Sequence, residues 1–227
     1  MAKTTEGRCL FCGKTLRKTL IKRHLDQCDV RANEYIIKDA EKTERYFCIL
    51  AQGREDPRYW IYVDMPSKST LHRLDNFLRD IWLECCGHLS MFKIAGQTFH
   101  SNPDREFRDR SMNLKLESVL SPGMQFGYEY DFGSTTMLKL KVVSEFRGNK
   151  RGKEVKLLAR NIEPVIECDY CGKQATNVCC QCLYDGDAWV CDDCIDKHEC
   201  EEDMFLPVVN SPRVGVCAYS GSFLEYE

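Results

Sequence analysis

Several common features are missing from this chain of 227 residues, and each absence narrows the class of protein. No run approaches the roughly 20 consecutive apolar residues that a membrane-spanning helix needs. The first residues, MAKTTEGRCLFC, lack the apolar core of a secretory signal peptide. We therefore expect a soluble protein with a cytoplasmic location.

The signatures of common catalytic sites are also missing. The sequence contains no G-x-S-x-G, P-loop or H-E-x-x-H pattern. Asp131-Phe132-Gly133 matches a kinase tripeptide, but neither a glycine-rich phosphate loop nor an HRD-like loop accompanies it. We interpret it as a corner between a strand and a turn, with Gly133 at positive φ. The sequence favours a non-enzymatic protein with no catalytic residue and no organic cofactor.

Positive charge is scarce at the C-terminal end. Residues 163–227 contain three Lys and Arg against 14 Asp and Glu, whereas residues 1–33 contain eight against three. Residues 34–162 contain 21 against 18. Because phosphate groups are attracted by clustered Lys and Arg, we expect any contact with nucleic acid near the N-terminus.

Cysteine is abundant but unevenly placed. Of 15 cysteines, only Cys48, Cys85 and Cys86 fall between residues 34 and 167. Secreted disulfide frameworks spread cysteines through a small domain, whereas paired C-x2-C spacings in an intracellular chain are typical of metal sites. We expect three zinc ions and three domains: a zinc finger (1–33), a central recognition domain (34–162) and a two-zinc module with a tail (163–227).

The first metal site is predicted from Cys9, Cys12, His24 and Cys28. Two thiolates on a tight turn supply half a tetrahedron, and a His and a Cys four residues apart on one helical face supply the rest. The segment resembles the C2HC zinc fingers of DNA-repair proteins that bind ubiquitin, in which the residue matching Asp26 contributes to the contact. The predicted helix is also basic, so phosphate contact or a purely structural role stays open.

The central residues alternate in patterns that predict an α+β domain. Two strand-forming runs, residues 46–50 and 59–63, flank the turn GREDPR. A helix is predicted from Ser69 or Thr70 to about Cys85, because apolar residues recur at helical spacing. Further strands are expected at 89–94, 97–100, 124–130, 135–146 and 154–161, with a basic hairpin at 147–153. We predict one helix packed across a mixed sheet, in a β-grasp-like arrangement.

Dispersed motifs in this region carry a resemblance. The segments Trp60–Asp64, Leu71–Leu74, Cys86–Phe92 and Phe126–Ser134 resemble the plasmid Ri open-reading-frame-three-like family, whose members are often labelled insertion-element passenger proteins. The resemblance implies an α+β domain found on mobile elements and chromosomes, with no settled biochemical activity. The tail from Asn210 to Tyr219 resembles the ending that accompanies this domain, and we expect it to fold back onto a neighbouring domain.

Three further residues of the central domain invite a metal site. Cys85, Cys86 and His88 lie close in sequence but lack a second ligand pair, so we interpret them as buried thiols and a loop histidine. His72 is expected to be a surface or half-buried side chain of its helix rather than a metal ligand.

The C-terminal segment carries the densest metal motif, with ten candidate ligands where two tetrahedral zinc ions need eight. We predict an interleaved cross-brace, similar in spacing to B-box and ZZ-like modules, with Cys180 left over. One zinc is assigned to Cys168, Cys171, Cys191 and Cys194, the other to Cys179, Cys182, His198 and Cys200. Two alternatives stay open. Cys217 could replace Cys200, or the ligand pairs could combine in consecutive instead of interleaved order.

The charge of this module bears on its partners. Residues 163–203 hold twelve acidic side chains against Lys173 and Lys197, and zinc-bound thiolates add negative charge. Such a surface repels phosphate. We predict a non-enzymatic adaptor that binds protein partners, with a nucleic-acid-binding regulatory protein as the alternative. A metalloenzyme is disfavoured, because four protein ligands per zinc are typical of structural sites.

Overall fold

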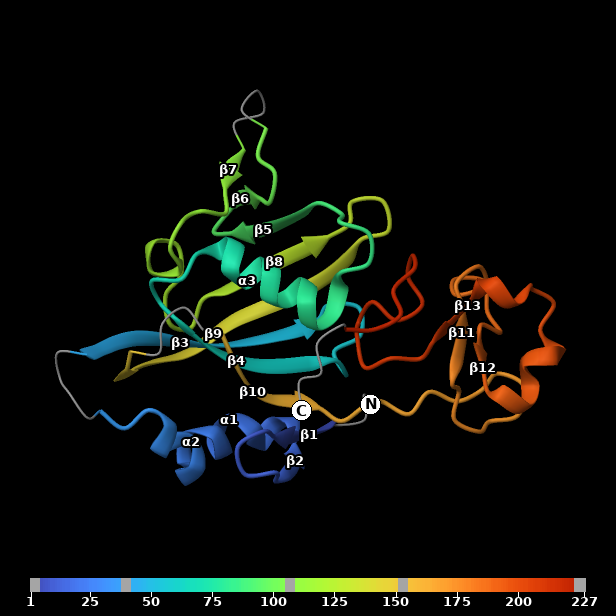
Figure 1. Cartoon of the computed structure of the whole chain (residues 1–227), viewed down its shortest axis with the longest axis horizontal. Coiled ribbons are helices and arrows are strands. Elements are labelled where there is room, and N and C mark those ends of the chain that lie inside the picture. The colour runs from blue at the N-terminus through green and yellow to red at the C-terminus, as the bar shows by residue number, and fades with distance from the viewer. Residues whose placement is uncertain (1–4, 38–41, 105–108, 151–154, 223–227) are drawn as a thin grey trace.

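The computed structural model describes residues 5–37, 42–104, 109–150 and 155–222. It shows an α+β fold with one large mixed sheet, a few helices and a smaller three-stranded sheet at the C-terminal end (Figure 1). The predicted fold class is confirmed at this level, and the β-grasp-like comparison stays a prediction.

The large sheet has ten strands in the order β2-β1-β10-β4-β3-β9-β8-β5-β6-β7. Among these strands only β6 and β7 pair in parallel. The strand bounds are β1 Glu6–Cys9, β2 Thr15–Arg17, β3 Thr43–Gly53, β4 Trp60–Pro66, β5 Ser90–Ile94, β6 Gln97–His100, β7 Arg110–Ser111, β8 Gln125–Tyr130, β9 Thr136–Asn149 and β10 Lys156–Asn161.

Helix α3 (Leu71–Leu78) covers one face of this sheet (Figure 1). Its N-cap is Thr70, whose side-chain oxygen accepts a hydrogen bond from the backbone N–H of Arg73 at 3.3 Å. The expected helix to Cys85 is shorter: α3 is followed by a π-helical turn, Arg79–Leu83, and the backbone becomes extended at Glu84. The turn buries Ile81, Trp82 and Leu83, so three consecutive side chains reach the core.

Alternation along β3 and β4 builds two cores on opposite faces. Phe47 and Ile49 of β3 face α3, whereas Cys48 between them lies in a second cluster with Trp60 and Tyr62 of β4. This second cluster is covered by α1 (Lys18–Gln27), which contributes Ile21 and Leu25 and precedes α2 (Asp29–Glu34).

The N-terminal finger is joined to the large sheet through its backbone. Strand β1 pairs antiparallel with β10, and β2 pairs with β1. Gly7 lies against the ring of Trp60: a Cβ at this position would stand 2.1 Å from Trp60 Cη2. The finger therefore packs as an edge of the main sheet.

The C-terminal module has its own sheet, in the order β12-β11-β13. Its strands are β11 Asn177–Cys179, β12 Trp189–Val190 and β13 Phe205–Pro207, with short 3-10 turns at Asp192–Lys197 and Glu202–Met204. After β13 the chain returns to the main sheet, where the Ser211 hydroxyl donates to the carbonyl of Trp82 at 2.7 Å. The expectation that the tail folds back is confirmed.

The other expected strands are present within a few residues of their predicted bounds. Residues 151–153 of the expected basic hairpin lie outside the described residues, although β9 does extend to Asn149. No helix in the described ranges is both long and apolar enough to cross a membrane.

Candidate metal centres

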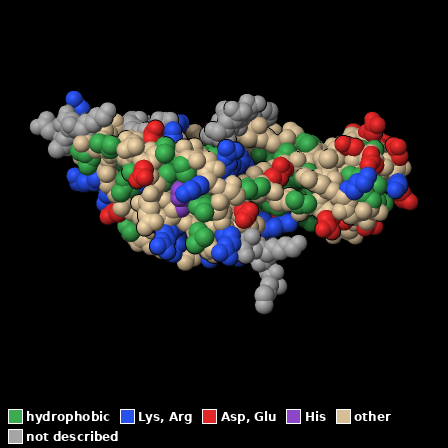
Figure 2. Space-filling view, turned by 90° about the horizontal axis from the view of Figure 1, so that it is seen from below, with side chains coloured by type: hydrophobic (Ala, Val, Ile, Leu, Met, Phe, Trp, Pro, Cys, Tyr) green, Lys and Arg blue, Asp and Glu red, His purple; other side chains and the backbone are tan. Residues whose placement is uncertain are grey.

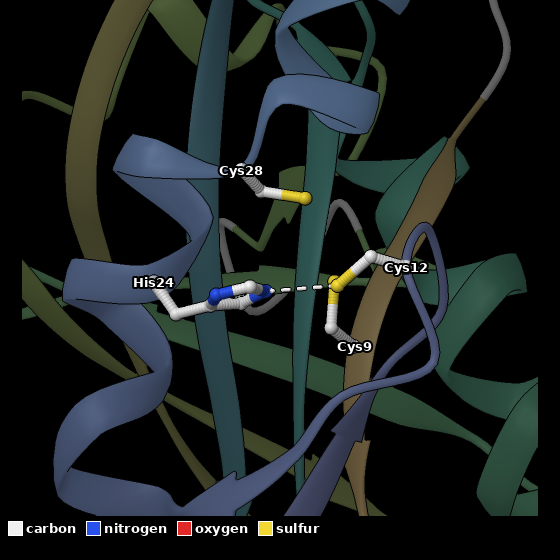
Figure 3. Close-up of side chains that lie close together, drawn as sticks. All are labelled: Cys9, Cys12, His24 and Cys28. Carbon is white, nitrogen blue, oxygen red and sulfur yellow. Dashed lines mark hydrogen bonds between the residues drawn. The ribbon is translucent and has the colours of Figure 1, made fainter.

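The four predicted ligands of the finger point toward one another (Figure 3). Cys9 ends β1, Cys12 lies in the following turn, His24 is on α1 and Cys28 follows that helix. Their donor atoms all lie within 4.8 Å of one another, with Cys12 Sγ 3.3 Å from His24 Nε2. Zinc–sulfur and zinc–nitrogen bonds of about 2.3 and 2.0 Å place such a pair about 3.5 Å apart in a tetrahedron.

The turn that presents Cys9 and Cys12 is built by backbone hydrogen bonds. The N–H of Gly13 donates to Cys9 O, and the N–H of Cys9 donates to Lys14 O, both at 2.9 Å. Gly13 has φ +73°, a conformation that a side chain would strain. The sequence C-x2-C-G-K therefore folds into a loop that holds two sulfur atoms on one side.

The same six-residue turn recurs in the C-terminal module at Cys168-Asp-Tyr-Cys171-Gly172-Lys173. Gly172 has φ +74°, its N–H donates to Cys168 O, and the N–H of Cys168 donates to Lys173 O. The recurrence of one local geometry at two distant places follows from one local sequence.

The module brings its eight predicted ligands together as two groups. Cys168 and Cys171 meet Cys191 and Cys194, and Cys171 Sγ is 3.5 Å from Cys191 Sγ. The second group comprises Cys179, Cys182, His198 and Cys200, with the Sγ atoms of Cys182 and Cys200 3.6 Å apart. The first pair in sequence converges with the third and the second with the fourth, which is the interleaved order.

The hydrogen bonding of the two ring nitrogens of His198 is typical of a metal ligand. Its Nδ1 lies 3.0 Å from the hydroxyl of Tyr170, while its Nε2 is buried and has no hydrogen-bond partner among the described residues. Metal-bound histidines are commonly held by a hydrogen bond at the nitrogen that does not bind the metal. Tyr170 supplies that bond here.

In each module cluster the pKa of one thiol is lowered and the pKa of a neighbouring thiol is raised. Burial acts to raise the pKa of Cys168, but N–H groups of Cys191, Tyr170 and Cys171 outweigh it, so that its pKa is lowered to about 6. Burial and hydrogen bonds to Cys171 and Cys168 raise the pKa of Cys191 to about 12. In the second cluster the hydrogen bond to Cys200, then burial, raises the pKa of Cys182 to about 12. Crowded thiols oppose each other's ionisation, and a divalent cation reverses that effect.

The leftover cysteines fall in different places. Cys180 belongs to neither module cluster, and its backbone N–H donates to Met204 O of the module. Cys217 does not replace Cys200; it lies with Cys85, Cys86 and His88 in a fourth group of four donors within 4.8 Å. His88 lies in a loop before β5, as expected, but the interpretation of Cys85 and Cys86 as buried thiols is wrong. Cys86 is exposed, and its sulfur lies 3.7 Å from that of Cys217.

Two other interpretations from the sequence have different outcomes. His72 is exposed, as expected. The corner at Asp131-Phe132-Gly133 exists, but Asp131 rather than Gly133 adopts positive φ, at 63°. The Asp131 carboxylate accepts hydrogen bonds from the N–H groups of Gly133 and Ser134, and this local bonding lets an aspartate adopt the left-handed region.

The surface of the module is strongly acidic, which distinguishes it from the main sheet. All twelve acidic side chains between residues 163 and 203 are exposed. In the space-filling view the acidic side chains gather at the end that carries the module (Figure 2).

A family model described as "Plasmid pRiA4b ORF-3-like protein" matches residues 50–182, from β3 to the second cluster of the module. The chain belongs to this family. The match includes Cys85, Cys86 and His88, whereas the finger and Cys217 lie outside it.

Comparison with solved structures finds a protein of unknown function from Methanosarcina mazei. It is 17% identical, covers 51% of this chain and 67% of its own, and has a TM-score of 0.44. Comparison with curated proteins gave no match.

Proposed function

We propose that the chain is a non-enzymatic, zinc-binding adaptor whose C-terminal module docks on a basic segment of a protein partner. The observation that carries this proposal is that all twelve acidic side chains around the two four-donor clusters are exposed. In finer detail, we propose that three of the clusters hold zinc, that the finger is of the ubiquitin-binding C2HC type and that the module is B-box/ZZ-like. Association with mobile elements is part of the same proposal.

The negative charge of the module favours a positively charged partner. A zinc bound by four thiolates carries a net charge of about −2, and one bound by three thiolates and a histidine about −1. These charges add to the twelve carboxylates, so the module attracts Lys- and Arg-rich surfaces and repels phosphate. Exposed aromatic rings strengthen contacts with cationic side chains, and Tyr184 is 79% exposed.

A cleft beside Tyr184 gives the partner a place to enter. It has a volume of about 270 Å³ and lies between the module, the tail and the main sheet. Leu183, Tyr184 and Val214 give the cleft an apolar lining, and Glu55 lines it together with Arg54. The aliphatic stem of a basic side chain can pack on the apolar part of this lining.

Binding of the zinc-loaded full chain to a labelled Lys/Arg-rich peptide tests this proposal, with an acidic peptide of the same length as the negative control. A variant carrying Glu199→Lys, Glu201→Lys and Glu202→Lys should lose about tenfold or more in affinity. The matched control Asp29→Lys, Asp104→Lys and Glu145→Lys makes the same change in net charge on exposed positions of the finger and main sheet. Equal loss in both variants, or no binding of the basic peptide, would contradict the proposal.

A second candidate function, binding of nucleic acid, is supported by a basic groove on the main sheet. Arg54 and Lys139 line a cavity of about 440 Å³ on β5, β8 and β9, together with Lys93, which is paired with Glu129, and Lys141 lines a neighbouring cavity. The groove adjoins the finger, because Lys18 Nζ donates to Gln52 Oε1, which lines the same neighbouring cavity.

The groove changes which basic residues should contact phosphate. Lys18 is already bonded to Gln52 and to the carbonyl of Pro57, and Lys22 is paired with Asp26. In a titration of a labelled DNA duplex from low to physiological salt, Lys139→Gln/Lys141→Gln should flatten the dependence of log affinity on log salt by roughly two. Lys68→Gln/Lys115→Gln, at another cavity beside α3, is the control. Undetectable binding at low salt would exclude this candidate.

A further inference from the structure

We propose that Cys85, Cys86, His88 and Cys217 form a fourth zinc site, which fastens the C-terminal tail to the main sheet. Three of these residues follow the π-helical turn after α3, and the fourth lies in the tail beyond the two-zinc module. The site is independent of the adaptor function proposed above.

The donor spacing is that of a tetrahedral zinc. Cys86 Sγ lies 3.7 Å from Cys217 Sγ, and Cys217 Sγ lies 3.6 Å from His88 Nε2. Bonds of about 2.3 Å to sulfur and 2.0 Å to nitrogen place two sulfurs about 3.8 Å apart, and a sulfur and a nitrogen about 3.5 Å apart. The other three clusters, which carry C-x2-C motifs, have comparable separations between 3.3 and 3.6 Å.

The backbone adopts positive φ angles at Gly87 and at Cys217, on both sides of the site. Gly87, between Cys86 and His88, has φ +74°, and no atom lies within 4 Å of where its Cβ would stand. Cys217 has φ +57°, a conformation that is unfavourable for a residue with a side chain. A metal bond to its sulfur supplies an interaction that offsets this cost.

The tail segment that carries Cys217 is held firmly against the sheet. Arg213 has no exposed surface and donates to Asp131 Oδ2 at 2.7 Å, to Thr136 Oγ1 at 3.0 Å and to Cys85 Sγ at 3.5 Å. The hydrogen bond from Ser211 to Trp82 anchors the same segment. The cluster is therefore held in place by packing on both sides.

The geometry fits a metal better than the two other uses of such residues. A disulfide needs sulfurs about 2.05 Å apart, and three thiols with a histidine exceed what one disulfide uses. In a nucleophile–base–carboxylate triad the carboxylate holds the histidine nitrogen away from the nucleophile. Here Cys217 Sγ and Asp131 Oδ2 both face the same atom, His88 Nε2, at 3.6 Å. Three thiolates and one imidazole are a donor set that zinc prefers.

The consequence concerns the two-zinc module. Its chain enters from β10 and leaves through the tail, so β10 fixes one end and this site fixes the other. Zinc at the site would hold the module beside the main sheet, including the cleft at Tyr184, which Val216 also lines.

Zinc stoichiometry of the purified, reduced full chain tests the proposal. Wild type should release four zinc ions per chain on denaturation, one for each cluster, and Cys217→Ser should release three. His88→Gln should also release three, which keeps the test valid if one variant misfolds. Cys180→Ser, outside all four clusters, should release four.

Two further readouts distinguish the site from other outcomes. In Cys217→Ser, proteolytic cleavage between residues 200 and 222 should become faster than in wild type, while the far-ultraviolet dichroism stays unchanged. Three zinc ions in wild type, unchanged in Cys217→Ser and His88→Gln, would overturn the proposal. A Cys86–Cys217 disulfide in protein that binds only three zinc ions after reduction would overturn it as well.

Discussion

Arg213 of the tail and Asp131 of the main sheet form a buried ion pair, with Nη2 2.7 Å from Oδ2. Arg213 is fully buried and its guanidinium also lies over the ring of Tyr130, 4.9 Å from the centroid. The two residues are 82 positions apart in sequence, so the pair joins the end of the chain to the corner after β8.

Breaking this ion pair should lower the free energy of unfolding. Arg213→Met leaves Asp131 buried without its cation, and we expect a loss of about 3 kcal/mol in the free energy of unfolding. Urea denaturation of the zinc-loaded protein measures it. Arg54→Met, at an exposed arginine, is the control, and Arg213→Met/Asp131→Asn should recover part of the loss. A change below about 1 kcal/mol would show that the pair is not what seats the tail.

Lys18 should make stability depend on alkaline pH. Burial lowers its pKa to about 8, against the opposing effect of Asp56, from an ordinary value of 10.5. Between these two values the unfolded chain binds more protons than the folded one, so the free energy of unfolding should rise with pH in this window. Unfolding measured at about pH 7.5 and about pH 10 should show a smaller rise in Lys18→Met than in wild type. Lys14→Met, an exposed lysine of the same finger, should keep the wild-type rise.

Paired substitutions can determine how the module's ligands are shared. If the donors act as the structure groups them, Cys171→Ser/Cys191→Ser should lose one zinc, and Cys171→Ser/Cys182→Ser should lose two. Consecutive pairing would give the reverse. Zinc released on denaturation is the measurement, and dichroism of each variant reports whether the main sheet remains folded.

Gly7→Ala should weaken the junction between the finger and the main sheet. The new methyl group would stand 2.1 Å from Trp60 Cη2 and 2.5 Å from Arg160 O, so the strands must move apart. Overpacking of this kind costs about 1–3 kcal/mol. Gly127→Ala is the matched control, because its Cβ would meet only Lys93 Cβ, at 3.6 Å. Equal midpoints of denaturation for the two variants would contradict the expectation.

The sequence predicted the features that short segments determine. The geometry of the two C-x2-C-G-K turns is determined by six consecutive residues. The strands around Ile49 and Ile61 were predicted from local alternation and apolar runs. The grouping of the module's ligands was also predicted, because spacing and steric order limit the choices.

What the sequence did not reveal depends on residues far apart along the chain. Cys217 and His88 are 129 positions apart, and neither has a C-x2-C partner that would mark it as a ligand. The pairing of β1 with β10 is equally non-local, since Gly7 faces Asn161. At Asp131, side-chain bonding to the next turn outweighed the general preference of glycine for positive φ.

Strand β10 lies between β1 of the finger and β4 of the central domain, and the module begins directly after it (Figure 1). In mechanical terms, a partner that pulls on the module loads β10 along its length, in shear against both neighbours. If the finger holds the proposed zinc, removing that ion takes away the support of one neighbour, so the force that the module withstands would be set in part at the opposite end of the chain.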